Sequence, residues 1–88
     1  MLNNHGLLTC ASSIADAFLM MFTFQRACEI QVLAQTGGAE LIPVDGQILA
    51  GAKAMIAGVT KSTQGMGGAL AWPALLRTLD KQDPSYKE

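Results

Sequence analysis

Apolar residues recur at helical spacing along residues 14–35 and predict a long helix. Ser13 lies three residues before Asp16, as in an Asp version of the capping box, and the acid also suits the positive end of a helix dipole. Gly37-Gly38 supplies the residue type that tolerates the left-handed conformation at a helix end. The helix should therefore run from about Ile14 to about Gln35.

The first half of this helix is apolar on nearly every side. Its apolar positions form three stripes: Ile14, Phe18, Met21, Cys28 and Val32; then Leu19, Phe22 and Leu33; then Met20, Phe24 and Ala27. A surface helix of a small monomer shows one such stripe. We therefore expect more protein around the segment Ile14–Phe24 than the rest of this chain supplies.

Two further helices are predicted. Asp45 is a candidate cap for the second, whose single apolar face comprises Ile48, Leu49, Ala52, Met55, Ile56 and Val59. Three glycines weaken this helix, so tertiary contacts should hold it. A Gly-rich linker over residues 61–68 leads to a short third helix containing Trp72, Leu75, Leu76 and Leu79. Pro73 fits there if it falls in the first turn, and Asp83-Pro84 ends the helix before a frayed tail of residues 85–88.

The segment Leu7–Cys10 is short and apolar and suits a brief strand, although it has no sheet to join. The prediction is a mainly α chain of about three helices with a short N-terminal strand. At 88 residues it forms a single domain at most.

The composition favours association with other protein. Half of the residues are hydrophobic and 15% are charged, against about 25% charged in typical globular domains. Because apolar surface on a small chain usually meets another chain, we expect a homo-oligomer, a dimer or larger, formed through the helix Ile14–Phe24. The net charge of -1 and the scattered basic residues argue against nucleic acid.

Neither a secretory signal nor a transmembrane segment is visible, so a cytoplasmic location is expected. The dense apolar run from Ala17 to Phe24 is far shorter than the roughly 20 residues that span a bilayer. Cys10 and Cys28 lack a C-x-x-C motif and a neighbouring histidine, so we expect two buried free thiols.

His5 is the one histidine, and any Ser-His-Asp or Cys-His arrangement would have to use it. Cys10 would reach it only through a tight fold-back of the intervening chain. A zinc site needs at least three protein ligands, so His5 alone is not a site. The simplest interpretation is a solvent-facing histidine in a flexible N-terminus.

Three other features have structural explanations. Gly65-Met66-Gly67-Gly68 could cradle phosphate, but the Walker lysine and hydroxyl are absent, which favours a linker. Arg26 and Glu29 stand one helical turn apart and predict a solvated ion pair. An apolar groove for a small ligand could be lined by Met20, Met21, Met55 and Trp72, although methionines at helical spacing usually belong to a core.

Three ordered motifs resemble class II aldolase/adducin domains. They are Asn4-His5-Gly6-Leu7-Leu8-Thr9, then Ser13-Ile14-Ala15-Asp16-Ala17-Phe18, and then the run from Arg26 to Gln35. In that family an H-G turn leads through a strand into a long helix. The ending Trp72-Pro73-Ala74-Leu75-Leu76-Arg77, with Leu79-Asp80 and Asp83-Pro84-Ser85-Tyr86, resembles the C-terminus of larger members. The resemblance covers essentially residues 1–88.

The resemblance implies that His5 corresponds to the last of the family's three zinc ligands. The other two ligands form an upstream H-x-H pair, and the acid/base glutamate also precedes this point, so the resemblance implies an incomplete metal site with no catalytic residue. The chain would then be a truncated C-terminal remnant of an α/β domain, with no cofactor expected for it alone and zinc as the cofactor of the family.

Two functions follow as expectations. The first is a non-catalytic helical oligomer or interaction module, since adducin-like members keep the fold without catalysis. The alternative is a piece of a zinc-dependent sugar-phosphate aldolase or epimerase that is active only with the missing upstream part. In such enzymes zinc acts as a Lewis acid on the enediolate.

Overall fold

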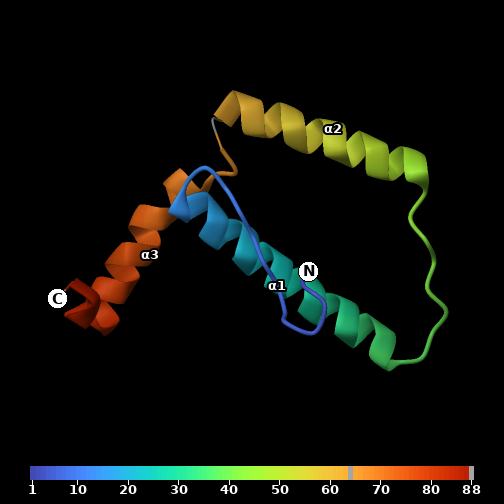
Figure 1. Cartoon of the computed structure of the whole chain (residues 1–88), viewed down its shortest axis with the longest axis horizontal. Coiled ribbons are helices and arrows are strands. Elements are labelled where there is room, and N and C mark those ends of the chain that lie inside the picture. The colour runs from blue at the N-terminus through green and yellow to red at the C-terminus, as the bar shows by residue number, and fades with distance from the viewer. Residues whose placement is uncertain (64, 88) are drawn as a thin grey trace.

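The computed structural model of the chain describes residues 1–63 and 65–87. Within them lie three α-helices, α1 (Ile14–Thr36), α2 (Gly46–Thr63) and α3 (Gly68–Gln82), followed by a short 3-10 helix, η1 (Pro84–Lys87). Figure 1 shows α1 and α3 meeting at one corner, while α2 is separated from both by open space. The prediction of a mainly α chain with three helices is confirmed.

The predicted strand at Leu7–Cys10 pairs with nothing in the described residues. One isolated antiparallel bridge joins Leu2 and Gly6, and residues 7–11 continue as extended chain without a ladder partner. In Figure 1 this segment runs back alongside α1. Thr9 Oγ1 donates a hydrogen bond to the carbonyl of Ala17 at 3.0 Å, so a side chain ties the segment to the helix.

Local signals set both ends of α1. The Ser13 hydroxyl accepts a hydrogen bond from the Asp16 N–H at 3.1 Å, as an N-cap should. At the other end Gly38 has a φ of +67°, a left-handed conformation that glycine adopts at little cost. The predicted limits of this helix are confirmed to within about one residue.

Helix α2 begins where the sequence predicts, because Asp45 Oδ1 accepts a hydrogen bond from the Gln47 N–H at 2.7 Å. It extends to Thr63, so residues 61–63 are helical and not part of a linker, and Gln64 lies outside the described residues. The expectation that tertiary contacts hold α2 is wrong for this structure. Contacts between described elements join α1 to α3 and α3 to η1, which leaves the apolar face of α2 in solvent.

Helix α3 begins at Gly68, four residues before Trp72, so Pro73 lies inside the helix and not in its first turn. Proline has no N–H and cannot donate to the carbonyl four residues earlier. The sequence-based expectation for Pro73 is therefore wrong. The helix ends at Gln82 before Asp83-Pro84, as predicted.

The predicted frayed tail is ordered through Lys87. Residues 84–87 form η1, in which the Tyr86 hydroxyl donates to Asp80 Oδ1 and Lys87 Nζ lies 2.8 Å from the same oxygen. Two side chains thus attach η1 to α3. Glu88, also predicted to fray, lies outside the described residues.

Helices α1 and α3 pack through two aromatic rings. The rings of Phe18 and Trp72 meet edge to face with centroids 5.5 Å apart, a favoured arrangement for aromatic pairs. Trp72 is thus the aromatic residue through which α3 packs on α1. However, no hydrophobic side chain among the described residues is fully buried. The radius of gyration is 16.7 Å, against roughly 12 Å for a compact domain of this length.

Among the described residues, no helix combines the length and the apolar character that crossing a membrane requires.

Candidate functional site

A tight turn at residues 2–6 fixes the position of His5. The Leu2 N–H donates to the carbonyl of Gly6 at 2.7 Å, and Gly6 has a φ of +114°, a conformation that favours glycine. His5 Nδ1 lies 2.8 Å from the carbonyl oxygen of Asn3. Because a carbonyl oxygen only accepts, Nδ1 carries the hydrogen. The lone pair of a neutral imidazole is then on Nε2, which is free to face a ligand.

The residues around His5 do not complete a zinc site. A catalytic zinc needs three protein ligands. Across residues 1–63 and 65–87, no group of three His, Cys, Asp or Glu side chains could share a metal ion. The zinc that the family resemblance implies therefore does not fit the described residues alone, and His5 contributes one donor.

The two cysteines are free, as predicted, but they are not buried. Cys10 is exposed and Cys28 is half-buried. The prediction of buried thiols fails because the N-terminal segment and α1 have no further layer over them. Neither thiol belongs to a cluster that could hold a metal within the described residues.

Asp16 is the best-organised polar group of the molecule. Its side chain is 6% exposed. Its Oδ1 accepts two backbone hydrogen bonds, from the Met66 N–H at 3.1 Å and from the Gly68 N–H at 2.9 Å. Successive amides that converge on one anion form a nest. Here the anion is a carboxylate from α1, and the amides belong to Gly68, the first residue of α3, and to Met66 in the connection before it.

Glycine is required on the α3 side of this joint. A Cβ atom on Gly68 would lie 2.4 Å from the backbone carbonyl carbon of Ala15, so the backbones of α1 and α3 are in direct contact there. At Gly65 a Cβ atom would lie 2.6 Å from Asp16 Oδ2, and the φ of +153° also disfavours other residues. Gly67, with a φ of +86°, lies between them in the left-handed region.

Sequence reasoning identified both halves of this joint but did not connect them. Asp16 was expected to act only within its own helix, and the glycine run was assigned to a linker after the phosphate alternative was set aside. The run does bind an anion with its amides, and that anion belongs to the same chain. The sequence features that could have indicated this joint were an acidic residue at the start of one helix and a Gly-rich stretch before another.

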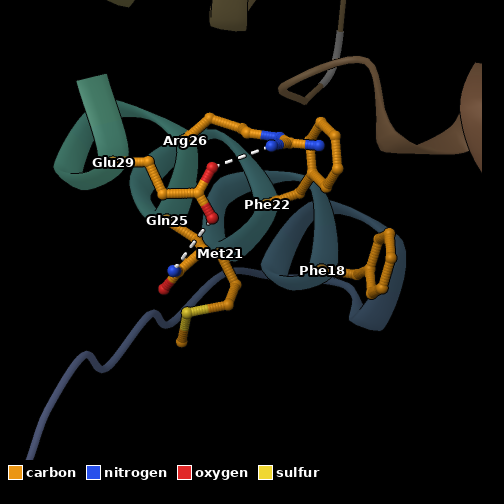
Figure 2. Close-up of a pocket in the computed structure, with 6 residues that line it drawn as sticks. All are labelled: Phe18, Met21, Phe22, Gln25, Arg26 and Glu29. Atoms are coloured by element: carbon orange, nitrogen blue, oxygen red, sulfur yellow. Dashed lines mark hydrogen bonds and ion pairs between the residues drawn. The ribbon is translucent and has the colours of Figure 1, made fainter. Parts of the chain in front are cut away.

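An open groove of about 360 Å3 runs along one side of α1. Its lining residues are Phe18, Met21, Phe22, Gln25, Arg26 and Glu29. Figure 2 shows the Arg26 guanidinium beside the Phe22 ring, with Glu29 between Arg26 and Gln25. Arg26 Nη1 lies 2.7 Å from Glu29 Oε2, and the guanidinium carbon lies 5.5 Å from the ring centroid. The predicted Arg26–Glu29 ion pair is confirmed.

Hydrogen bonds from Arg26 and then Gln25 lower the pKa of the Glu29 carboxyl. Both partners of the ion pair remain solvent-exposed, so the pair adds little to stability. With Phe22 beneath the guanidinium, the groove offers an aromatic and an arginine side by side. These residue types are enriched where proteins bind other proteins.

The proposed methionine groove is not formed. Met20 lines a second groove together with Met66, Met21 lies in the groove of Figure 2, and Trp72 lines a third with Phe18. Met55 is exposed on α2, which contacts neither α1 nor α3. The four side chains lie on three helices, and these helices do not converge on one groove.

Comparisons with known proteins agree with the motifs. Residues 1–32 match the profile of a family described as Class II Aldolase and Adducin N-terminal domain. A Pseudomonas aeruginosa protein, named as a candidate class 2 aldolase, is 72% identical over 87 residues, which are 99% of this chain and 34% of that protein. A Caulobacter vibrioides protein with the same designation is 39% identical over 90 residues, covering 100% of this chain and 33% of that protein.

The chain therefore spans about a third of the length of these curated relatives. No solved structure matches it.

Proposed function

Because the chain belongs to the class II aldolase and adducin family, we propose that it serves there as a non-catalytic helical module that associates with further protein. One observation carries the proposal: the described residues include no buried hydrophobic side chain. A sequence that is half hydrophobic gains its main stabilisation by removing apolar area from water. Association is the step that would supply this burial.

The first half of α1 is the proposed contact surface. Asp16 and Trp72 already fix one end of this segment to α3, while the Phe22 ring remains 51% exposed. Covering a half-exposed phenylalanine removes roughly 100 Å2 of apolar area, worth about 2.5 kcal/mol at the usual coefficient. Phe22 also carries the stacked Arg26. We propose that the segment Ile14–Phe24 pairs with its counterpart in a second copy, giving a homodimer or larger assembly.

Light scattering coupled to size exclusion at low micromolar concentration tests this proposal. The natural chain should elute as a dimer or larger, and Phe22→Glu should shift it to monomer, because the pairing would bury an unpaired carboxylate. Gln35→Glu, at the exposed end of the same helix, is the matched control and should stay associated. A compact, folded monomer of the natural chain would contradict the proposal.

The second candidate function is a part of a zinc-dependent aldolase or epimerase. The geometry of His5 favours it, because a histidine that binds a metal usually donates its other ring N–H to a carbonyl or carboxylate, and Nδ1 faces the Asn3 carbonyl. His5 would then bind zinc through Nε2, with the remaining ligands and the acid/base glutamate supplied by other protein. The chain alone is expected to hold no stoichiometric zinc.

Elemental analysis after desalting distinguishes the two candidates. About one zinc per chain, lost in His5→Ala, would favour the metalloenzyme part over the non-catalytic module. A fractional ratio such as one zinc per three chains would instead indicate that several His5 side chains meet on a symmetry axis. Thr9→Ala is the control, since it changes the same segment and leaves His5 in place.

A further inference from the structure

An Asp-Gly pair lies where the connection between α1 and α2 ends. Asp45 caps α2, and Gly46 is the first residue of that helix. Both residues are exposed, and a Cβ atom added to Gly46 would meet no atom within 4 Å. Figure 1 shows the connection passing through open space before α2 begins. Water therefore reaches this pair, and α2 contacts no other described element that would restrain it.

The side-chain carboxyl of an aspartate can condense with the backbone amide of the next residue to form a succinimide. Here the Gly46 nitrogen would attack Asp45 Cγ, and the N–H proton would leave with the hydroxyl group of the protonated carboxyl as water. Water then opens the ring at either carbonyl, which regenerates aspartate or produces isoaspartate, whose main chain runs through Cγ. Glycine favours ring closure because it has no Cβ to obstruct the attacking nitrogen and its backbone turns freely.

The capping hydrogen bond of Asp45 keeps the reacting groups close to each other. Asp45 Oδ1 accepts from the Gln47 N–H at 2.7 Å, and the ring that this bond closes includes the Gly46 amide nitrogen. The Gln47 N–H also polarises the carboxyl, and it would stabilise the oxyanion that forms when the nitrogen adds. The Gly46 N–H itself lies in the first turn of a helix, where amides have no acceptor within the helix.

From these contacts we propose that Asp45 is a site of spontaneous isomerisation, at which isoaspartate forms and uncaps α2. The other aspartates lack this combination of features. Asp16 is 6% exposed, and Asp80 lies inside α3, where the backbone amides bond to the preceding turn. Asp83 precedes Pro84, which has no N–H with which to attack.

Isoaspartate exchanges the two groups through which Asp45 begins α2. In the aspartate form the side chain accepts from the Gln47 N–H, and the backbone carbonyl accepts from the Leu49 N–H at 3.1 Å. In isoaspartate the former side-chain carbonyl belongs to the main chain, which is longer by one methylene group, and the former backbone carbonyl ends a side chain. Neither bond keeps its geometry. Because glycines weaken α2 and no other described element supports it, loss of the cap should fray its first turns.

Ageing the purified chain at mildly acidic pH tests the proposal. Peptide mapping by mass spectrometry separates isoaspartyl from aspartyl peptides of the same mass and detects the succinimide as the loss of one water. Isoaspartate should accumulate at Asp45 and not at Asp16 or Asp80, at a rate comparable to that of the chain unfolded in urea. Helical circular dichroism should fall as isoaspartate accumulates. Treatment with a protein isoaspartate methyltransferase and S-adenosylmethionine, which returns isoaspartate to the succinimide, should restore part of the signal.

Gly46→Ala and Gly51→Ala form a matched pair of variants. Each adds a methyl group to α2 where no atom lies within 4 Å, and each favours the helix. Gly46→Ala should slow isoaspartate formation about 10-fold, because its Cβ hinders the attacking nitrogen, and Gly51→Ala should leave the rate unchanged.

Equal slowing by the two variants would overturn the proposal, because the stability of α2 alone would then set the rate. Isoaspartate that forms in urea but not in the folded chain would also overturn it, as would equal amounts at Asp16 or Asp80. A constant circular dichroism signal while Asp45 converts would show that the modification does not uncap α2.

Discussion

At the scale of single residues, Asp16 holds the joint between α1 and α3. It was expected to act as a capping acid, and the Ser13 cap is present, but the carboxylate accepts from two amides that lie 50 and 52 residues further along the chain. A sequence shows the acid and the glycines separately. It does not show that they meet in the folded chain, because residues 50 positions apart are not related by the periodicity of any one helix.

Replacing Asp16 should therefore loosen α3 from α1. Asp16→Ala leaves two amide donors without an acceptor and should destabilise the joint by about 2 kcal/mol. Asp16→Asn keeps one oxygen acceptor and should lose less. Thermal unfolding followed by circular dichroism measures both, and equal melting temperatures for all three chains would mean that the hydrogen bonds do not hold the helices together.

Gly68 and Gly58 form a matched pair of glycine substitutions. Gly68→Ala should separate the two helices, because its Cβ would lie within 2.5 Å of the Ala15 backbone. Gly58→Ala meets no atom within 4 Å and should stabilise α2 by about 1 kcal/mol through helix propensity alone. Opposite changes in melting temperature are expected, and a shift of the same sign in both would contradict the close approach at Gly68.

Tyr86 gives a pH-dependent readout of the C-terminal 3-10 helix. Its hydrogen bond to Asp80 raises the pKa of the phenol, and hydrogen bonds from Lys87 and Tyr86 lower the pKa of the Asp80 carboxyl. The contact is therefore present between the two pKa values. It is lost as the pH rises through the raised phenol pKa and as the pH falls through the lowered carboxyl pKa.

Ultraviolet absorbance of the phenolate measures this shift directly, because the chain has one tyrosine. The titration midpoint should lie above 10.0, the ordinary value for tyrosine, and Asp80→Asn should return it towards that value. A midpoint that Asp80→Asn leaves unchanged would show that η1 is detached in solution.

At the scale of helices, the sequence predicted the elements well where local chemistry defines them. Helix α1 has a Ser cap at one end and a left-handed glycine at the other, and its limits were predicted correctly. Helix α3 begins earlier than predicted because Asp16 caps its first amides from another helix. Pro73 consequently lies in the helix interior, which no local rule anticipates.

Trp72→Ala should weaken the packing of α3 on α1. The indole contacts the Phe18 ring but is only half-buried, so the loss should be about 2 kcal/mol, below the 3–5 kcal/mol usual for a fully buried aromatic. Trp72→Phe, which keeps an aromatic ring, is the control and should lose less. An unchanged melting curve for Trp72→Ala would show that α3 does not belong to the folded unit.

At the scale of the whole molecule, the sequence predicted that the chain exposes more apolar surface than its own helices can cover. It did not predict that much of this surface lies on α2. Which helix is left uncovered depends on tertiary packing, and α2, expected to be held by its neighbours, is the most exposed helix of the three. Its apolar face has the periodicity of an ordinary amphipathic helix. Periodicity indicates that a face will be covered and does not indicate by which chain.

Association of the folded chain should make its melting temperature depend on concentration, because mass action stabilises a folded state that binds its own copy. Raising the chain concentration tenfold should raise the melting temperature measurably in the natural chain. Phe22→Glu should abolish the dependence. A melting temperature independent of concentration in the natural chain would indicate that folding is complete within one copy.

The edge-to-face contact of Phe18 and Trp72 also gives the molecule a built-in optical probe. Trp72 is the one tryptophan of the chain, and it lies at the joint where α1 and α3 meet. Its fluorescence therefore reports the opening of that joint without any added label. Emission should shift to longer wavelength in Asp16→Ala, as water reaches the indole, and should stay unshifted in Gly58→Ala, whose change lies on the separate α2.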